Sequence, residues 1–310
     1  MHRSKMTKIN MKIPAALKKG DKVAIVCPAS FVRGTVDVAI KILKSWGLDV
    51  VVGESVTSKF NQFAGTDALR AADLQAALDD ESIKAVFAGR GGYGTVRIID
   101  QINFDRFVMQ PKWIIGFSDI TVLHSHIQRI FGIATLHGQM PKLFEESSTN
   151  GLTTLKNILF GETLAYSFSQ TLFPNKTGNA EGTLIGGNLA ILHSILASPS
   201  DMDYDGKILF IEDVGEPYYN IDRMLWTLKR AGKLAHLKGL LVGSFTAMKD
   251  ATPGFGQSVE EIIMDKVREY DYPVAFHFPA GHIDDNHALI LGSKVKMNVK
   301  DMEVSLKFIK

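Results

Sequence analysis

Residues 113–120 read Trp-Ile-Ile-Gly-Phe-Ser-Asp-Ile, and we interpret them as a buried strand that ends in a sharp turn and opens a helix. The strand is the apolar run 113–117, and apolar side chains recur at helical spacing over 120–130. The same alternation occurs N-terminal to this stretch. There we expect strands at 22–27, 48–52 and 83–88, and helices at 36–46, at 66–78 and from the end of a glycine run to about residue 99. Such alternation predicts an α/β fold with a parallel sheet covered by helices on both faces.

The second half of the chain mixes strands and helices. We expect strands at 207–212, 239–245 and 273–278, helices at about 220–229 and 258–270, and a closing hairpin-like pair at 288–291 and 294–300. Two loop-rich stretches, 147–151 and 174–179, place a domain junction between the halves. We therefore predict an N-terminal domain over 1–165, a linker over 166–179 and a C-terminal domain over 180–310.

Composition narrows the class of protein. The chain has 310 residues, of which 45% are apolar and 22% charged, which is typical of globular proteins and excludes disordered, collagen and coiled-coil classes. Lys and Arg number 35 and Asp and Glu 33, so the net charge of +2 gives no support to a nucleic-acid partner. No apolar run reaches the roughly 18 residues of a membrane span. We therefore predict neither a nucleic-acid nor a membrane partner.

Cysteine content and the N-terminus indicate a compartment. Cys27 is the single cysteine, which excludes an intramolecular disulfide and a zinc site built on several cysteines. It follows three apolar residues, so we interpret it as a buried small side chain rather than a nucleophile. The first twenty residues hold six Lys or Arg and no acid, and no apolar segment of about 7–15 residues follows as in a secretory signal. We expect a solvated basic tail and a cytoplasmic protein.

A glycine-rich stretch follows the third predicted strand. Residues 89–94, Gly-Arg-Gly-Gly-Tyr-Gly, match the G-x-G-x-x-G pattern of dinucleotide-binding turns. The acidic residue expected about 20 positions later is absent there, and the nearest candidate is Asp119. The same backbone could present N–H groups to a developing oxyanion. A tight turn without a ligand is the third alternative.

Ser118 lies at the turn between strand and helix, where a side chain projects beyond the end of a sheet. The surrounding G-x-S-x pattern is that of a hydrolase nucleophile, except that Ile120 replaces the final glycine. The N–H of Asp119 would lie at a helix N-terminus and could stabilise an oxyanion. The alternative is that Ser118 only caps the helix, as serines often do.

A nucleophilic serine needs a base. Among nine histidines, His282 follows a strand in the small-residue turn Pro-Ala-Gly-His, where catalytic groups often lie. His137 lies close behind the serine helix and stays a candidate. We expect His124 and His126, inside that helix, to face a groove or solvent, and His193 to pack in an apolar helix.

The base in turn needs an acid to orient it. Glu212 and Asp213 end an apolar strand, and only one of them can face a given partner because side chains alternate along a strand. Glu216 follows shortly after. Helix capping and surface solvation are the alternative roles for these acids. The order of Ser118, Glu212 and His282 along the chain is also that of α/β-hydrolases.

Five blocks of sequence, in order, resemble one family. They are residues 90–94, 116–119, 181–189, 211–217 with Asp222-Arg223, and 281–282. This set resembles the LD-carboxypeptidase family, the muramoyltetrapeptide carboxypeptidases, which are serine peptidases. The resemblance extends from about residue 22 to about residue 307.

The resemblance implies a flavodoxin-like or Rossmann-like N-terminal domain and a C-terminal α/β domain around a small β-barrel-like sheet. It implies a catalytic triad, and an oxyanion hole made by two backbone N–H groups. The triad falls on Ser118, Glu212 and His282, and the oxyanion hole on Gly92 and Asp119. The glycine stretch is then no nucleotide site, and neither a metal nor another cofactor is implied.

The substrate's terminal carboxylate needs a cation or N–H groups. Arg90, Asn188 and Arg223 are candidates by their place in the matching blocks, and the sequence does not choose among them. Pairing with a local acid is the favoured alternative for Arg223.

The resemblance also implies a substrate. The family removes the terminal D-alanine of murein tetrapeptides by cutting an L,D bond during cytoplasmic recycling, and its members are commonly dimers. Microcin C immunity proteins share the triad but hydrolyse peptidyl or aminoacyl nucleotides, and they carry extra loop sequence. Here the stretches 161–181 and 212–282 are short, which favours the murein peptide. The nucleotide-linked substrate, and a non-catalytic binding module, stay open.

Overall fold

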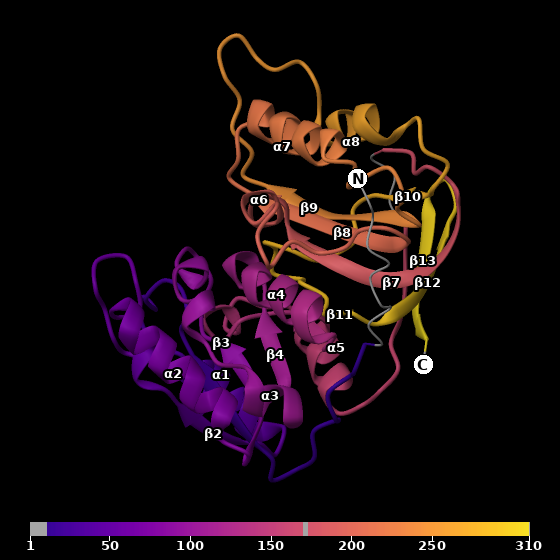
Figure 1. The fold of residues 1–310 in the computed structure, drawn as a ribbon. Helices are drawn as coiled ribbons and strands as arrows, with labels where there is room; N and C mark the ends of the chain where they lie inside the picture. Colours follow the sequence, from indigo (N-terminus) through magenta and orange to yellow (C-terminus); the bar gives the residue numbers. More distant parts are fainter. Residues whose placement is uncertain (1–10, 170–172, 310) are drawn as a thin grey trace, which may run out of the picture.

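The computed structural model describes residues 11–169 and 173–309 and contains two β-sheets with helices packed against them (Figure 1). In Figure 1 the N-terminal half forms the lower body and the C-terminal half the upper one. The predicted basic tail falls mostly on residues 1–10, and the predicted linker includes 170–172; these positions lie outside the described residues. Within the described ranges, no helix is long and apolar enough to cross a bilayer.

The first sheet confirms the predicted α/β alternation. Its strand order is β11-β5-β4-β3-β1-β2, with β1 at Lys22–Val26, β2 at Asp49–Val52, β3 at Ile83–Ala88, β4 at Trp113–Gly116, β5 at Thr135–His137 and β11 at Leu289–Leu291. Strands β1 to β5 pair in parallel, and β11 is antiparallel to β5. Its helices are α1 (Asp37–Ser45), α2 (Asp67–Asp79), α3 (Asp105–Met109), α4 (Thr121–Phe131) and α5 (Thr149–Leu159).

Both faces of this sheet are buried, as the apolar strands predict. Ala24 and Val26 belong to one core cluster, whereas Val23 and Ile25 belong to the cluster on the other face. Alternate side chains of a strand point to opposite faces, so the sheet is covered on both sides. Cys27 is buried in the second cluster, as predicted, and burial raises the pKa of its thiol to about 12.

The second sheet is mixed. Its order is β10-β9-β8-β7-β12-β13-β6, with β6 at Ala165–Ser169, β7 at Gly178–Asn188, β8 at Lys207–Val214, β9 at Gly239–Thr246, β10 at Val274–Ala275, β12 at Lys294–Val299 and β13 at Glu303–Ile309. Strands β7 to β10 are parallel, and β12, β13 and β6 are antiparallel additions. Helices α6 (Leu189–Ser194), α7 (Tyr218–Arg230) and α8 (Val259–Val267) cover one face. In Figure 1, β12 and β13 run across the direction of β8 and β9, so the sheet curves strongly.

Two predictions of local structure are wrong. The helix expected after the glycine run is two short 3₁₀ turns, η2 (Thr95–Arg97) and η3 (Ile99–Gln101), in a stretch rich in β-branched residues that disfavour helix. The expected hairpin between 288–291 and 294–300 does not form either. Instead β11 joins β5 of the first sheet, and β12 pairs with β13, which we did not predict. Gly292, at φ +94°, turns the chain between the two sheets.

The domain boundaries at 165 and 180 stay a prediction. Strand β6 spans the first boundary and lies in the second sheet, and β11, from the predicted C-terminal domain, lies in the first. The second sheet also touches helix α4 of the N-terminal half at Gly187, whose φ is +141° and where a Cβ would lie 2.5 Å from Thr121 Oγ1. Thr121 Oγ1 accepts a hydrogen bond from the N–H of Asn188 at 3.1 Å. The start of α4, just after Ser118, is therefore where the two bodies meet.

Candidate active site

Ser118 is held in a turn of unusual backbone conformation. It is half-buried and follows β4 at the start of a 3₁₀ turn, η4 (Ser118–Ile120), with φ +62°. A residue other than glycine in this left-handed region is strained, and such strain clusters at functional sites. Within the described part of the chain its Oγ makes no hydrogen bond, and α4 has no side-chain cap. Ser118 therefore does not serve as the helix cap that we considered.

The glycine-rich stretch lies against this serine. A Cβ at Gly91 would lie 3.2 Å from Ser118 Oγ, so only glycine lets the loop approach so closely. Gly92 has φ +106°, and a Cβ there would lie 2.3 Å from Ser30 Oγ. Ser30 Oγ accepts the N–H of Tyr93 at 3.2 Å, which holds the loop. The N–H of Gly92 has no partner among the described residues, and the N–H of Asp119 lies in a first helical turn, where intrahelical acceptors are lacking.

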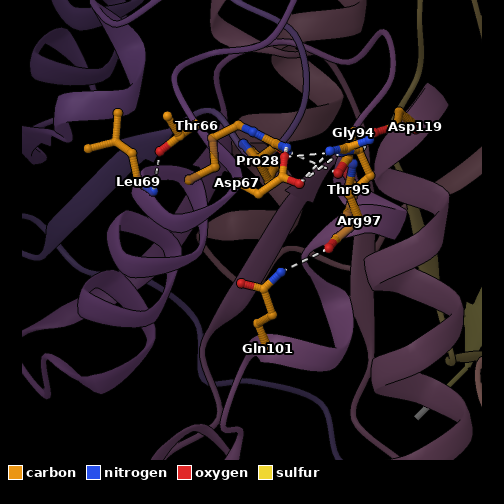
Figure 2. Close-up of polar contacts among 10 residues, drawn as sticks. Pro28, Thr66, Asp67, Leu69, Gly94, Thr95, Arg97, Gln101 and Asp119 are labelled. Atoms are coloured by element: carbon orange, nitrogen blue, oxygen red, sulfur yellow. Dashed lines mark hydrogen bonds and ion pairs between the residues drawn. The ribbon is translucent and has the colours of Figure 1, made fainter. Parts of the chain in front are cut away.

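The side chain of Asp119 ties the serine turn to the glycine loop. Its Oδ2 accepts the N–H of Thr95 at 2.9 Å, as Figure 2 shows. The carboxyl is 1% exposed, and burial raises its pKa. Fully buried Arg70 donates to the carbonyls of Pro28 and, at 2.9 Å, Gly94, and so fixes the far end of the same loop. Buried polar side chains thus fix the position of the glycine-rich loop relative to the serine turn.

Glu212 and His282 form a hydrogen-bonded pair near the C-terminal end of β8. Glu212, in β8, is fully buried, and its Oε2 accepts a hydrogen bond from His282 Nδ1 at 2.7 Å. Burial alone would lower the pKa of His282, but the hydrogen bond and charge of Glu212 outweigh it, so the pKa is raised. Gly281 makes the approach possible, because a Cβ there would lie 2.8 Å from Glu212 Oε2. Since Nδ1 is engaged, Nε2 is the ring nitrogen left to exchange a proton.

A ring contact connects this pair to the serine turn. The ring of His282 lies edge-on to that of Phe117, the residue before Ser118, with centroids 4.9 Å apart. The structure thus brings the ends of β4 and β8 and the loop before β11 together. Three groups predicted from separate parts of the sequence, Ser118, Glu212 and His282, lie at this junction.

Asp213 faces the other way, as strand alternation predicts. Its carboxylate accepts from Asn188 Nδ2 at 3.1 Å and from the N–H of Ala190 at 2.9 Å. Burial, and then the charge of Glu212, raise the pKa of Asp213 to about 7. Asn188 Oδ1 in turn caps α6 by accepting the N–H of Ile191. Both the nitrogen and the oxygen of the Asn188 amide therefore have partners inside the protein.

The other two predicted carboxylate-binding residues also make internal contacts. Half-buried Arg90 donates to the carbonyl of Phe31 at 2.9 Å. Exposed Arg223 donates to Asn220 Oδ1, and Asn220 donates to Glu216. Glu216, which precedes α7, therefore belongs to a local network at the start of that helix, and among the described residues no contact with His282 is found for it.

Our expectation for two histidines of α4 is wrong. His124 is fully buried and its Nε2 lies 2.9 Å from the carbonyl of Gly116; burial lowers its pKa to about 4. His126 is 9% exposed and its Nδ1 contacts Ser200 Oγ at 3.0 Å. They are buried because α4 packs both on the first sheet and on α6. His137 is buried between Phe117 and Phe210, and burial lowers its pKa to about 3.

A cavity of about 180 Å³ opens beside His282. Its walls come from the end of β4, the segment after β5 and the loop before β11: Phe117, Gln139, Leu143, Glu146, His282, Ile283 and Asp284. Sequence reasoning missed Gln139, Glu146 and Asp284, since no local motif marks them. Over the described ranges, no three metal-ligating side chains cluster together.

Two family models match this chain. The LD-carboxypeptidase N-terminal domain matches residues 23–138, and the LD-carboxypeptidase C-terminal domain matches residues 181–297. A protein of Bacillus subtilis (strain 168) named "Probable murein peptide carboxypeptidase" is 36% identical over 296 residues, which cover 93% of this chain and 92% of that protein.

Solved structures share the fold. The muramoyltetrapeptide carboxypeptidase of Oxalobacter formigenes has a TM-score of 0.84 and 27% identity, over 93% of this chain and 99% of that one. The microcin C7 self immunity protein MccF in complex with aspartyl sulfamoyl adenosine has a TM-score of 0.85 at 20% identity, over 95% and 98% of the two chains. From the two domain matches and the full-length relative, we conclude that this chain belongs to the LD-carboxypeptidase family and is an enzyme of the carboxypeptidase class.

Proposed function

We propose that this protein is a serine LD-carboxypeptidase that releases the terminal D-alanine of murein tetrapeptides through Ser118, His282 and Glu212. The hydrogen bond between half-buried His282 and buried Glu212 carries this proposal, because the histidine ring packs against the residue next to a strained serine. A serine, a histidine and an orienting carboxylate at adjoining strand ends form the constellation of acyl-transfer enzymes on unrelated folds.

In the proposed mechanism, Ser118 Oγ attacks the scissile carbonyl while His282 Nε2 takes the hydroxyl proton. The N–H groups of Gly92 and Asp119 stabilise the oxyanion of the tetrahedral intermediate. The intermediate collapses, and His282 passes the proton to the nitrogen of the departing D-alanine. Water, deprotonated by the same histidine, then hydrolyses the acyl-enzyme and restores Ser118. Glu212 holds the imidazole in the tautomer that both steps need and stabilises its cationic form.

In this proposal, Ser118 Oγ and His282 Nε2 form their hydrogen bond when the substrate binds. Catalytic hydrogen bonds are often long in free enzymes and tighten when the substrate binds. Gly91 has no side chain, so the glycine loop lies close to Ser118 Oγ. In this proposal the scissile carbonyl binds between Ser118 and the N–H of Gly92, where the oxyanion forms.

The proposed substrate is inferred from the names of the relatives and from the short stretches 161–181 and 212–282. The Bacillus protein is named for murein peptide and the Oxalobacter structure for muramoyltetrapeptide. The alternative is hydrolysis of a peptidyl or aminoacyl nucleotide by the same groups. The immunity protein solved with aspartyl sulfamoyl adenosine has the same fold at 20% identity, so the fold is compatible with this alternative.

The test is a product analysis. Purified protein is incubated with a muramoyl tetrapeptide, with Ser118→Ala in parallel, and the products are identified by mass spectrometry. We expect the wild type alone to release one D-alanine per peptide. If the folded wild type releases none but cleaves an aminoacyl adenylate analogue with a hydrolysable bond, the nucleotide alternative is correct. Equal release by Ser118→Ala would eliminate this serine as nucleophile.

A further inference from the structure

Strand β9 contains a bulge directly opposite Glu212, the proposed orienting carboxylate. Over this stretch the paired residues of β8 advance by two, from 211 to 213, while those of β9 advance by three, from 242 to 245. Glu212 alone therefore faces two residues of β9, Gly243 and Ser244. Bulges are common next to active sites, where the extra residue changes the direction of a side chain.

The bulge places Ser244 on the same face of the sheet as Glu212. Val242 belongs to the core cluster under helices α6, α7 and α8, and Phe245 packs against the same cluster. These two residues are three positions apart, although a regular strand returns to the same face every two. In a regular strand Ser244 would share the face of Val242. With the bulge it lies on the opposite face, as Glu212 does, because Ile211 also belongs to the cluster.

The side chains of Ser244 and Glu212 meet at Gly281, the residue before the proposed base. A Cβ at Gly281 would collide with Ser244 Oγ and lie 2.8 Å from Glu212 Oε2, so both side chains border the same point. Ser244 Oγ and Glu212 Oε1 are shielded from solvent, and over residues 11–169 and 173–309 neither has a hydrogen-bond partner. A buried donor or acceptor without a partner is costly, so two such groups on neighbouring strands are expected to pair.

The bulged strand also holds the loop that carries His282. The N–H of Ser244 donates to the carbonyl of Ala280 at 2.8 Å, and Thr246 Oγ1 donates to the carbonyl of His282 at 3.2 Å. Gly243 leaves room for the loop, because a Cβ there would lie 2.5 Å from the carbonyl oxygen of Ala280. The same short segment of β9 therefore fixes both the hydroxyl of Ser244 and the backbone of the histidine.

We propose that Ser244 is a positioning residue whose hydroxyl donates a hydrogen bond to Glu212 Oε1 and thereby keeps Oε2 on Nδ1 of His282. A serine hydroxyl finds its acceptor by rotation about χ1, which has three staggered positions. A carboxylate with a donor on each oxygen is less free to turn away from the imidazole, which the reaction needs in one tautomer and one orientation. The inference rests on the proposed function, because Glu212 and His282 act there as acid and base.

The experiment is a double-mutant cycle on the release of D-alanine from the tetrapeptide. It compares the wild type, Ser244→Ala, Glu212→Ala and the double variant. Ser125→Ala is the matched control, because Ser125 in α4 also has a buried hydroxyl with no partner in the described part of the chain. Ser244→Cys keeps the volume of the side chain but is only a weak donor.

We expect Ser244→Ala and Ser244→Cys to lower kcat roughly tenfold with KM unchanged, since a hydrogen bond to a charged group is lost and the hydroxyl does not touch the substrate. In the Glu212→Ala background the same serine substitution should change kcat by less than about twofold, because the acceptor is already gone. Ser125→Ala should keep the wild-type kcat. Equal losses in both backgrounds, or full activity of Ser244→Cys, would overturn the positioning role.

A spectroscopic measurement separates failure of this inference from failure of the proposed function. The proton on His282 Nδ1, held by a carboxylate, gives a downfield NMR resonance that needs no substrate. We expect this resonance in the wild type and in Ser125→Ala, and its broadening by exchange with solvent in Ser244→Ala. If it is identical in Ser244→Ala, the positioning role is overturned even when D-alanine is released. If it broadens although the wild type releases no D-alanine, the positioning role stands and the proposed function fails.

Discussion

Replacing Glu212 by glutamine removes one negative charge from the candidate site and nearly preserves the side chain's shape. The carboxylate is fully buried, and its Oε2 lies 2.7 Å from His282 Nδ1. The proposed reaction makes His282 cationic in each transition state, so the carboxylate contributes more to the transition state than to the ground state. We therefore expect Glu212→Gln to lower kcat.

The magnitude depends on which way the new amide faces. If its oxygen faces Nδ1, the histidine keeps its tautomer and only the charge is lost. A hydrogen bond to a charged group contributes about 1.5–3 kcal/mol, which corresponds to about 10- to 150-fold in kcat. If its nitrogen faces Nδ1, Nε2 carries the proton and cannot accept that of Ser118, and the loss reaches about 10⁴-fold, as in a serine-protease triad with the equivalent change. Glu212 Oε1 has no partner among the described residues, so a donor placed on it, such as the proposed one of Ser244, decides between the two orientations.

The assay is D-alanine release from the tetrapeptide as a function of pH. The base must be neutral, so kcat/KM rises with pH through the pKa of His282, which Glu212 raises. In Glu212→Gln the plateau is lower, and the acid limb moves to lower pH. Asp213→Asn is the comparison variant, because it removes the adjacent buried carboxylate, which acts on His282 through its charge alone and makes no hydrogen bond to the ring, so its effect on the acid limb should be the smaller one. A variant at position 212 with less than threefold loss and an unmoved acid limb would refute the reasoning.

Substitutions at three further positions test the residues around the Glu212–His282 pair. Ser118→Gly and Ser118→Ala should both abolish release, but in urea unfolding the glycine variant should be about 1 kcal/mol more stable than the alanine variant, because φ is +62°; equal stabilities would contradict a strained turn. Asp119→Ala should lower kcat about tenfold by freeing the N–H of Thr95, and Asp119→Asn, which keeps an acceptor, should retain more activity; steady-state kinetics of both decide this. Asn286→Ala should lower kcat about tenfold with little change in KM, because Asn286 Oδ1 holds the N–H of Gly281 at 2.9 Å; a loss confined to KM would contradict a role in placing His282.

Local patterns predicted strands β1 to β4 of the parallel sheet because each is an apolar run between breakers, whereas β5, with the short sequence Thr-Leu-His, was not predicted. The strand at Ile83–Ala88 is predicted to the residue. The helix predicted at 66–78 is α2, and Thr66 caps it by accepting the N–H of Leu69. The pairing of β11 could not be predicted in this way. Its sequence, Leu-Ile-Leu, fits either sheet, and its choice of β5 over β12 depends on where the rest of the chain has already placed both strands. Pairing is a long-range property that periodicity does not contain.

The same distinction applies to the candidate site. Ser118, Glu212 and His282 could be picked because each stands at a strand end or in a glycine turn, which is a local signal. Gln139 and Asp284 carry no such signal. They share a cavity wall only because the segment after β5 and the loop before β11 flank the same antiparallel pair.

The chain passes from the second sheet to the first just before β11, and this passage explains why the position of the candidate base, His282, depends on both sheets. Its loop starts from the second sheet, where Glu212 holds the ring of His282, and ends in the first. On the way it is fixed to α5: the carbonyl of Asp284 accepts the N–H of Ser148 at 2.9 Å, and Thr154 Oγ1 accepts the N–H of Ala288 at 2.9 Å. The serine turn belongs to the first sheet as well. The distance between nucleophile and base is therefore set by the packing of the two sheets against each other, and neither body alone contains the arrangement that the proposed reaction requires.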